Sequence, residues 1–282
     1  MNEHCGQRQI YRCVPIITFV EKDLVNELLS ALDASVKENV SGKRTAVAFS
    51  GGLDSGMIAV LCKRHTDTTL YTAGVKNSYD EKASEEMSKI LNMERKYLEL
   101  SEEILEKELR NMIRITGTVN PITLSFEVPL YFVLKYSDEN VILSGQGADE
   151  LFAGYSKYVG LSEKELADAV KDDTLRLMNS TLIHERSVAE HFGKTIVYPY
   201  LDERVADVVR GMRKQGISEG DVRKPLLRDA AMMLGQPELA EKPKKSAQYG
   251  SGTMVMLRSM AKKKDMTVRE MISNMHSETG KE

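Results

Sequence analysis

A run of small and acidic residues near position 50 has the composition of a phosphate-binding turn. Ser50-Gly51-Gly52-Leu53-Asp54-Ser55 follows the apolar residues 45–49 and precedes the apolar residues 57–62, an order that predicts a buried strand, a tight turn and a helix. The two glycines let the backbone approach a ligand closely, and the N–H groups and dipole of the following helix attract phosphate. Asp54 would repel phosphate unless a cation lay between them, so the run predicts Mg²⁺ as well.

A second turn of the same kind lies further along the chain. Ser144-Gly145-Gln146-Gly147-Ala148-Asp149-Glu150 follows the apolar residues 140–143. Each turn places an Asp after a predicted strand, and Mg²⁺ needs only one or two carboxylates beside phosphate oxygens. We therefore expect Asp54 and Asp149 to share Mg²⁺ with the phosphates. The other interpretation of Asp54, a helix cap, is common for Asp, but a second Asp in a similar turn favours the metal site.

Strand and helix patterns alternate through the first half of the chain. The predicted strands are residues 45–49, 68–75, 95–100 and 140–143, and predicted helices cover residues 22–40, 79–91, 101–116 and 124–136. This alternation predicts an α/β fold with a doubly wound, mostly parallel sheet, in which ligands lie at the carboxyl ends of strands. From residue 161 onward the pattern is mainly helical.

The division that we expect is an irregular segment at residues 1–20, one domain at residues 21–265 with a soft internal boundary near residue 156, and a C-terminal helix with a frayed tail at residues 266–282.

Composition excludes several classes of function. The net charge of −3 gives no bulk attraction to nucleic acid or to an anionic membrane. No apolar run approaches the roughly 18 residues needed to span a bilayer, and the polar first twenty residues are not a signal peptide. The three cysteines, Cys5, Cys13 and Cys62, are sparse and odd in number, which is typical of free thiols in a reducing compartment. We therefore expect a cytoplasmic protein without nucleic-acid or membrane partners.

The first turn matches the S-G-G-x-D-S signature of the PP-loop ATP pyrophosphatases. These enzymes cleave ATP between its α- and β-phosphates, adenylate a carbonyl or carboxyl oxygen and release pyrophosphate. The narrower resemblance is to the asparagine synthetase C-terminal (synthetase) domain family. It rests on four further segments that occur in the family's order: residues 144–155, Tyr198-Pro-Tyr-Leu-Asp202, Lys224-Pro-Leu-Leu-Arg228, and the lysine loop from Lys242 to Gly252.

This resemblance implies an adenine nucleotide alpha hydrolase-like fold, with ATP and Mg²⁺ as cofactors. The nucleotide-binding residues that it implies are Ser50, Gly51, Gly52, Asp54, Ser55, Val75, Gly145, Gly147 and Tyr155. The catalytic residues that it implies are Lys244, Asp149 and Gln146. Lys244, or its neighbour Lys245, would neutralise charge on the α-phosphate as pyrophosphate leaves; its alternative role is a solvated basic loop. Lys224 and Arg228 are predicted to bind phosphate or, equally, to form a surface pair.

The implied reaction is that of an amidoligase, in which ammonia attacks an acyl-adenylate to give an amide, AMP and pyrophosphate. Aspartate is the default substrate. The alternatives are a PP-loop ligase acting on another carboxylate or carbonyl, and a regulatory subunit that binds ATP or AMP without chemistry. His184 and His191, seven residues apart, favour structural roles over a metal pair.

Three departures from the family pattern limit these implications. The residues before position 20 are too few for a glutaminase domain, so ammonia would come from solution or from a separate glutaminase subunit. Gln146 replaces the family's acidic residue and can neither accept a proton nor pair with an ammonium ion as a carboxylate does. Gly56 stands where a second Ser or Thr is usual.

Overall fold

Five parallel β-strands form the centre of the molecule in a computed structural model that describes residues 19–214, 223–242 and 250–279. The strands are β1 (Thr45–Ala48), β2 (Thr68–Gly74), β3 (Arg95–Glu99), β4 (Val141–Leu143) and β5 (Thr195–Val197). Their order in the sheet is β3-β2-β1-β4-β5. The chain thus builds outward from β1 to β3 and then returns to the other side of β1, which confirms the doubly wound α/β fold.

Strand β1 lies between β2 and β4. Thr45 pairs with Thr68 of β2 and with Val141 of β4, both in parallel register. Strand order reverses between β1 and β4, and the crevice beyond the carboxyl ends of two such strands is where doubly wound folds bind ligands. The two Ser-Gly turns follow these two strands.

Alternate side chains of the strands enter two separate cores, one on each face of the sheet. Val47 and Leu70 pack into one core and Ala46 and Tyr71 into the other, as the two-residue period of a strand requires. The first core is covered by α1 (Phe19–Val40), α2 (Leu53–Lys63), α3 (Tyr79–Ile90), α9 (Glu203–Lys214), α10 (Pro225–Met233) and α11 (Pro237–Ala240). The second is covered by α4 (Glu102–Thr116), α5 (Pro121–Tyr136), α8 (Leu182–His191), α13 (Thr253–Lys263) and α14 (Val268–Thr279).

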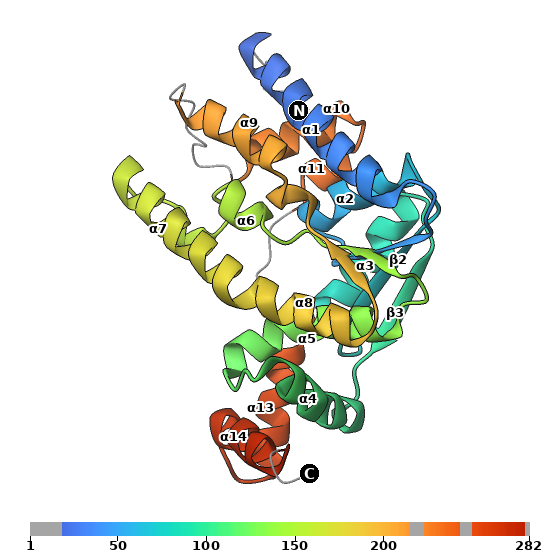
Figure 1. Ribbon diagram of the computed structural model, residues 1–282, viewed down its shortest axis with the longest axis vertical. Coiled ribbons are helices and arrows are strands. Elements are labelled where there is room, and N and C mark those ends of the chain that lie inside the picture. Colours follow the sequence, from blue (N-terminus) through green and yellow to red (C-terminus); the bar gives the residue numbers. More distant parts are fainter. Residues whose placement is uncertain (1–18, 215–222, 243–249, 280–282) are drawn as a thin grey trace, which may run out of the picture.

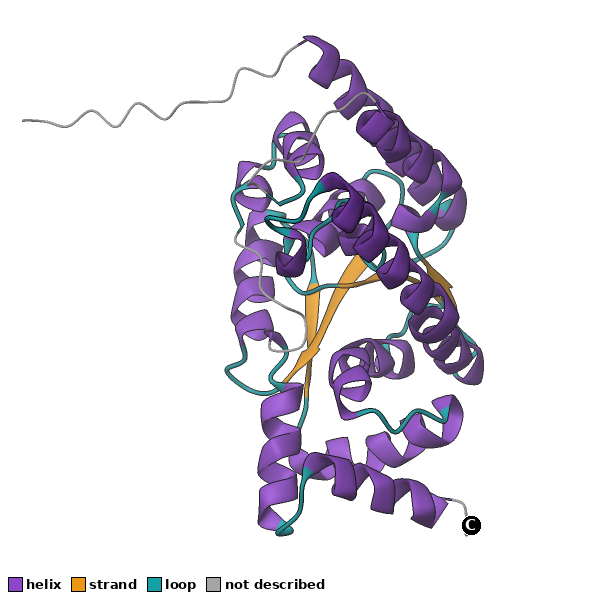
Figure 2. Cartoon of the chain, turned by 90° about the vertical axis from the view of Figure 1, so that its left-hand side faces the viewer, coloured by secondary structure: helices purple, strands orange, loops and turns teal. Residues whose placement is uncertain are grey.

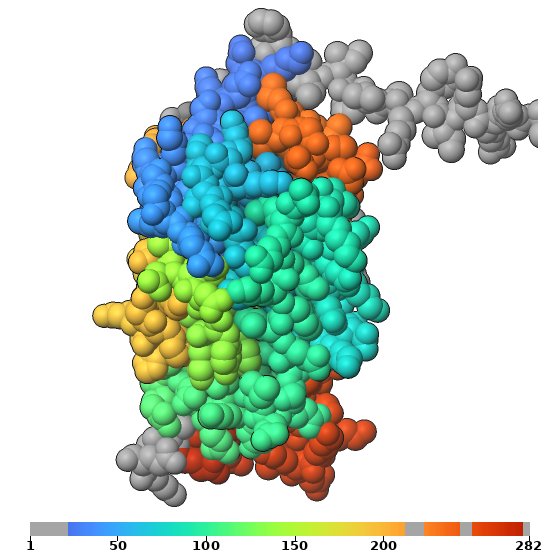
Figure 3. All heavy atoms as spheres, turned by 90° about the vertical axis from the view of Figure 1, so that its right-hand side faces the viewer, coloured from blue at the N-terminus to red at the C-terminus, as the bar shows by residue number. Residues whose placement is uncertain are grey.

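The two helical layers lie at opposite ends of the molecule, with the strands between them (Figures 1 and 2). Helix α1 pairs with α9 and α10 at one end, and α14 packs against α4 and α13 at the other. Figure 3 shows the side on which segments from the first half of the chain cover most of the surface, with the last helices at one end. Segments from both sides of residue 156 share each core, and the predicted internal boundary there stays a prediction.

The structure corrects two expectations about local structure. Strand β5 lies in the half of the chain that the pattern predicts as mainly helical, and it pairs with β4 through Ile196 and Ile142. The helix predicted at residues 124–136 begins three residues earlier, at Pro121. This proline occupies the first turn of α5, where its missing N–H costs nothing, and the Asn120 side chain caps the helix by accepting from Ile122 N at 2.9 Å.

The remaining elements are the helices α6 (Ala148–Leu151) and α7 (Glu163–Arg176) and the single turns η1 (Ser156–Tyr158), η2 (Leu177–Thr181) and η3 (Pro199–Leu201). Among the described residues, no helix is both long and apolar enough to cross a membrane.

Candidate active site

The two Ser-Gly turns lie in direct contact at the carboxyl ends of β1 and β4. A Cβ atom at Gly145 would lie 3.1 Å from the backbone nitrogen of Ser55 and 3.2 Å from the carbonyl carbon of Asp54. Any side chain at this position would therefore push the turns apart. The glycine of the second turn allows its backbone to close against the start of α2.

The first turn is shaped by its glycines and closed by its serines. Gly51 has a φ of +74°, and a Cβ there would lie 2.5 Å from the carbonyl oxygen of Ala83 on α3, so that only glycine fits. The Ser55 hydroxyl accepts from Ser50 N at 3.2 Å and lies 3.3 Å from the Ser50 hydroxyl. Helix α2 then starts after Gly52, and its first N–H groups face the turn.

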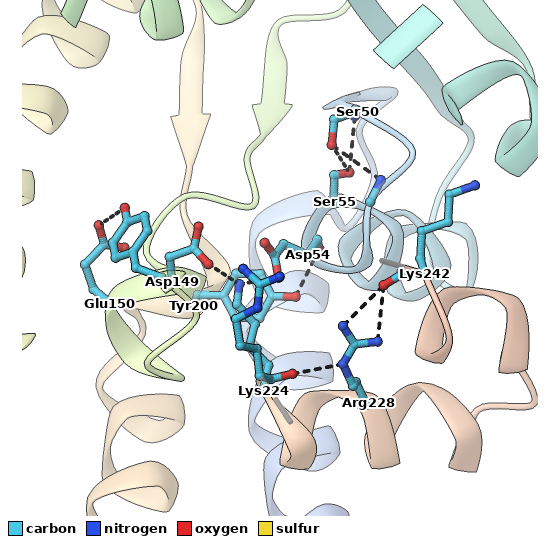
Figure 4. A network of polar contacts seen from close by, with 12 residues as sticks. Ser50, Asp54, Ser55, Asp149, Glu150, Tyr200, Lys224, Arg228 and Lys242 are labelled. Atoms are coloured by element: carbon cyan, nitrogen blue, oxygen red, sulfur yellow. Dashed lines mark hydrogen bonds and ion pairs between the residues drawn. The ribbon is translucent and has the colours of Figure 1, made fainter. Parts of the chain in front are cut away.

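Lys224 joins the two turns. Its ammonium nitrogen Nζ lies 2.6 Å from Asp54 Oδ1 and 2.7 Å from Asp149 Oδ1 (Figure 4). The Lys224 side chain is 2% exposed, whereas the two aspartates are 27% and 22% exposed. The interpretation of Lys224 as half of a surface pair is therefore wrong: its charge lies inside the molecule, between the two carboxylates that the sequence predicts to act together.

The backbone around Lys224 fixes its direction. Lys224 has the left-handed values φ 56° and ψ 49° and immediately precedes Pro225, the first residue of α10. Its side chain passes over Gly154, where a Cβ would lie 2.1 Å from Lys224 Cε and 2.2 Å from Asp149 Oδ1. Gly154 therefore makes the room that the lysine needs. The Lys-Pro pair and the glycine before Tyr155 are the sequence signals that could have located this contact.

Tyr200 supports the first turn from the motif at residues 198–202. Its hydroxyl donates to the carbonyl oxygen of Asp54 at 3.0 Å, and its ring is fully buried. Burial holds the pKa of Tyr200 well above its usual range, and the Asp54 charge adds to this rise, so the phenol stays a donor. Asp202, in contrast, pairs with Arg204, which lowers its pKa to about 2; its role is to tie α9 to the motif.

Arg228 holds the backbone that leads into the lysine loop. Its guanidinium donates to the carbonyl oxygens of Ala240 and Lys242, the latter at 3.2 Å, while Nε donates to Arg223 O at 2.9 Å (Figure 4). The surface-pair interpretation is thus wrong for Arg228 too. The predicted catalytic residue Lys244, and Lys245 beside it, lie outside the described residues.

Two cavities open beside the turns, and Gln146 lines both. The first, about 180 Å³, is lined by Ser50, Thr72, Ala73 and Glu185 among others. The second, about 760 Å³, is lined by acidic and basic side chains: Asp149, Glu150, Asp173, Lys157, Arg176 and Arg223. Tyr155 lines the second cavity, and its hydroxyl donates to Glu150 Oε1 at 2.7 Å. The site thus has a smaller chamber at the first turn and a larger, zwitterionic chamber at the second.

The predicted nucleotide contact at Val75 lies beside the smaller cavity rather than in its lining. The Val75 N–H donates to Ser251 O at 2.8 Å, and its carbonyl accepts from the Tyr97 hydroxyl at 2.9 Å. Thr72 and Ala73, three and two residues earlier on β2, line the cavity instead. A direct adenine contact at Val75 stays a prediction. Asp80 is not the N-cap of α3, a role that Ser78 fills, and it also lines this cavity.

The predicted magnesium ligands meet the requirements of a site shared with phosphate. Asp54 and Asp149 converge on Lys224 through one oxygen each, and both side chains remain partly open. Within the described residues, no group of three or more His, Cys, Asp or Glu side chains could hold a metal ion alone. Two carboxylates with phosphate oxygens form an environment that Mg²⁺ accepts, so the residues fit the ion.

Residues 27–182, more than half of the 282 residues, match the family model described as Asparagine synthase. The chain belongs to the asparagine synthase family. A protein of Methanocaldococcus jannaschii assigned as a glutamine-hydrolyzing asparagine synthetase is 29% identical over 273 residues, which cover 83% of this chain and 50% of that protein. Asparagine synthetase B (glutamine-hydrolyzing) of Escherichia coli is 25% identical over 226 residues, covering 72% of this chain and 41% of its own.

The chain therefore spans about half the length of the curated relatives that it matches. Among solved structures, the NH3-dependent NAD synthetase of Campylobacter jejuni aligns at 16% identity and a TM-score of 0.33, covering 80% of this chain and 98% of its own. That structural likeness is too distant to support an inference about function.

One departure of this asparagine synthase family member from the usual signature has a structural reason. A Cβ at Gly56 would lie 2.3 Å from Leu239 Cδ2, so the glycine admits α11 against α2. The other departure, Gln146, lies where the two chambers meet, and its amide donates to Glu185 Oε1 at 3.3 Å. Glu185 has no motif in the sequence; a single Glu on a helix gives no signal of burial.

Proposed function

We propose that this protein is an ATP- and Mg²⁺-dependent amidoligase that adenylates a carboxylate and transfers ammonia to it, releasing AMP and pyrophosphate. The observation that carries the proposal is the position of Lys224 between Asp54 and Asp149, at the junction of two glycine turns and two chambers. Asp54, Asp149 and Lys224 together carry one net negative charge, so a phosphate group would bind beside them together with Mg²⁺. Membership of the asparagine synthase family supports the same reaction class.

The first turn would hold the pyrophosphate part of ATP. The N–H groups of Gly51 and Gly52 and the hydroxyls of Ser50 and Ser55 are donors close to the start of α2, where the helix dipole favours anions. The adenosine would occupy the 180 Å³ chamber against Thr72 and Ala73. Gly145 and Gly147 would keep the second turn close to the α-phosphate.

Asp54 and Asp149 would hold Mg²⁺, which when bound supplies charge neutralisation on the phosphate oxygens. Lys224 would keep the two carboxylates in place and offset their mutual repulsion. Lys244 or Lys245 would supply the further positive charge as pyrophosphate leaves. The chain needs no nucleophile of its own for this step, because orientation and charge stabilisation carry it.

The larger chamber would hold the acyl substrate. Its lining combines carboxylates (Glu150, Asp173) with cations (Lys157, Arg176), a pattern that suits a substrate with both an ammonium and a carboxylate group. Aspartate is the default acid, and another amino acid of similar charge is the alternative. Ammonia would be the attacking amine, supplied from solution or by a glutaminase. A cytoplasmic location, which the sparse cysteines predict, suits an enzyme that uses ATP.

The deciding experiment measures pyrophosphate release with ATP, MgCl₂ and ammonium across a panel of amino-acid carboxylates. Release that depends on aspartate would support asparagine synthesis. Release with another acid but not aspartate would reject asparagine synthesis and retain the amidoligase. Tight ATP binding with no release for any acid would reject the amidoligase in favour of a regulatory nucleotide-binding subunit.

A further inference from the structure

The ammonium group of Lys224 lies between the two proposed magnesium ligands. Its Nζ contacts Asp54 Oδ1 at 2.6 Å and Asp149 Oδ1 at 2.7 Å, and Asp149 Oδ1 is itself buried. Mg²⁺ bonds its oxygen ligands directly, at about 2.1 Å. An ion that bridged the same two oxygens would therefore have to replace the ammonium group. In the protein without nucleotide, the lysine competes with the metal for the aspartates.

The backbone of Lys224 is held in place, so that only its side chain can turn. Helix α10 begins directly after it at Pro225, and Leu226 and Leu227 of this helix are buried in the core. The carbonyl oxygen of Lys224 accepts from Arg228 N at 3.0 Å. The lysine side chain is 2% exposed, and a buried charge costs free energy unless it is paired. A lysine that gives up the aspartates therefore needs another anionic partner.

Further positive charge from the same segment adjoins the aspartates. Burial lowers the pKa of Arg228 and the Asp54 charge opposes this effect, so the guanidinium lies near Asp54 (Figure 4). Arg223 lines the larger chamber together with Asp149. A divalent ion that arrives alone meets these like charges and offers Lys224 no partner. A triphosphate supplies both oxygen ligands for the ion and negative charge for the lysine.

We propose that Lys224 is a specificity-determining residue of the metal site: it keeps Mg²⁺ off Asp54 and Asp149 in the absence of nucleotide and admits the ion only together with ATP. The inference rests on the proposed function, because it takes the two aspartates as the ligands of Mg²⁺. When ATP occupies the first turn, its phosphates give the ammonium group new anionic partners, and the aspartate oxygens become available to the ion. ATP thus binds before Mg²⁺ or as its magnesium complex.

Binding of Mn²⁺, a paramagnetic substitute for Mg²⁺, tests this inference without any turnover. Electron paramagnetic resonance of the unbound ion gives its Kd for the full chain in the absence of nucleotide. We expect Lys224→Met and Lys224→Gln to bind Mn²⁺ at least about tenfold more tightly than wild type, because the competing charge is gone. Adding Asp149→Asn to Lys224→Met should abolish the gain, which would assign it to the aspartate pair. Lys263→Met removes an exposed lysine charge and, as the control for net charge, should bind Mn²⁺ as wild type does.

A second measurement separates this inference from the proposed function. Equilibrium dialysis of labelled ATP against wild type, with MgCl₂ or with EDTA, should show at least about tenfold tighter binding with MgCl₂. No ATP binding under either condition, or no effect of MgCl₂, would overturn the metal assignment of the proposed function and this inference with it.

The Mn²⁺ titration alone can overturn the inference while leaving the proposed function intact. Wild type that binds Mn²⁺ without ATP as tightly as both lysine variants would do so. Weaker binding by the variants would also overturn it and would mean that Lys224 orients the aspartates for the metal. Thermal unfolding of each variant confirms that it is folded.

Discussion

Lys224 Nζ lies 2.6 Å from Asp54 Oδ1, although the two residues are 170 positions apart in the sequence. The contact joins the start of α10 to the turn that follows the central strand. Asp149, from the second turn, completes the group at 2.7 Å. The cation that lies between the two aspartates is thus a side chain of the protein itself.

Removing the ammonium group should destabilise the free protein. In Lys224→Met the two aspartates would lose the ammonium group that lies between them, and we expect a loss of about 1–3 kcal/mol in the free energy of unfolding. Added MgCl₂ should stabilise this variant more than it stabilises the wild type. Urea unfolding with and without MgCl₂ measures both effects. Lys263→Met is the control: its ion pair with Glu102 is exposed and should contribute less than about 1 kcal/mol. Equal stability of Lys224→Met and wild type without magnesium would contradict the assigned role of Lys224.

A methyl group at Gly154 should displace Lys224 and Asp149 Oδ1 without removing either charge. The new Cβ would lie 2.1 Å from Lys224 Cε, so Gly154→Ala should reproduce much of the loss seen in Lys224→Met. Gly211→Ala is the matched control, because no heavy atom lies within 4 Å of its Cβ position inside α9. That change should be neutral or stabilise the helix by up to about 1 kcal/mol. Thermal unfolding of the two variants compares their stabilities, and equal melting temperatures would argue against a tight Lys224–Gly154 contact.

The two aspartates should be needed for turnover but not for folding. Asp54→Asn and Asp149→Asn each keep the shape of the side chain and remove a charge that Mg²⁺ requires. We expect pyrophosphate exchange to fall by more than about 100-fold in each, with an unchanged circular dichroism spectrum. A titration of wild-type activity with MgCl₂ and EDTA should show a strict requirement for the metal. Near-normal exchange in both variants would remove the metal assignment.

The buried acids should make the protein less stable as the pH rises. The pKa of Glu127 is raised to about 9 and that of Glu185 to about 8. Between pH 4.5 and these values the folded state keeps protons that the unfolded state has lost, so their stabilisation is complete below pH 4.5 and disappears as the pH approaches 9. Each such proton changes stability by at most about 1.4 kcal/mol per pH unit. Urea unfolding from pH 5 to 9 should show this decline, and Glu127→Gln should flatten it. A slope unchanged by Glu127→Gln would mean that Glu127 ionises normally.

Local sequence signals predicted the parts of the site that are continuous in the chain. The strand before Ser50, the glycine turn and the start of α2 are adjacent residues, and the same holds for the second turn at Ser144. The residue types at neighbouring positions of the chain determine such units. The pairing of β1 with β4 then follows from the rules of parallel sheets.

The parts that sequence reasoning missed depend on contacts between distant segments. Lys224 looks like any surface lysine until Gly154 gives it space and the two aspartates give it partners. Strand β5 has three residues, and its Thr195 is exposed, so its pattern is too short to distinguish from a loop. Glu185 is buried because α8 packs on α5 and β5, a relationship that no local pattern around residue 185 contains.

The backbone contact between the two turns distinguishes positions that must remain glycine from positions where the side chain can vary. Gly145 lies so close to Ser55 that even a methyl group would intrude. The backbone that would bind the nucleotide therefore tolerates few substitutions. Gln146 and Glu185 meet through side chains alone. Efforts to redirect the proposed ligase activity to a new acid or amine should therefore randomise Gln146 and the inner face of α8, and leave the glycines of both turns untouched.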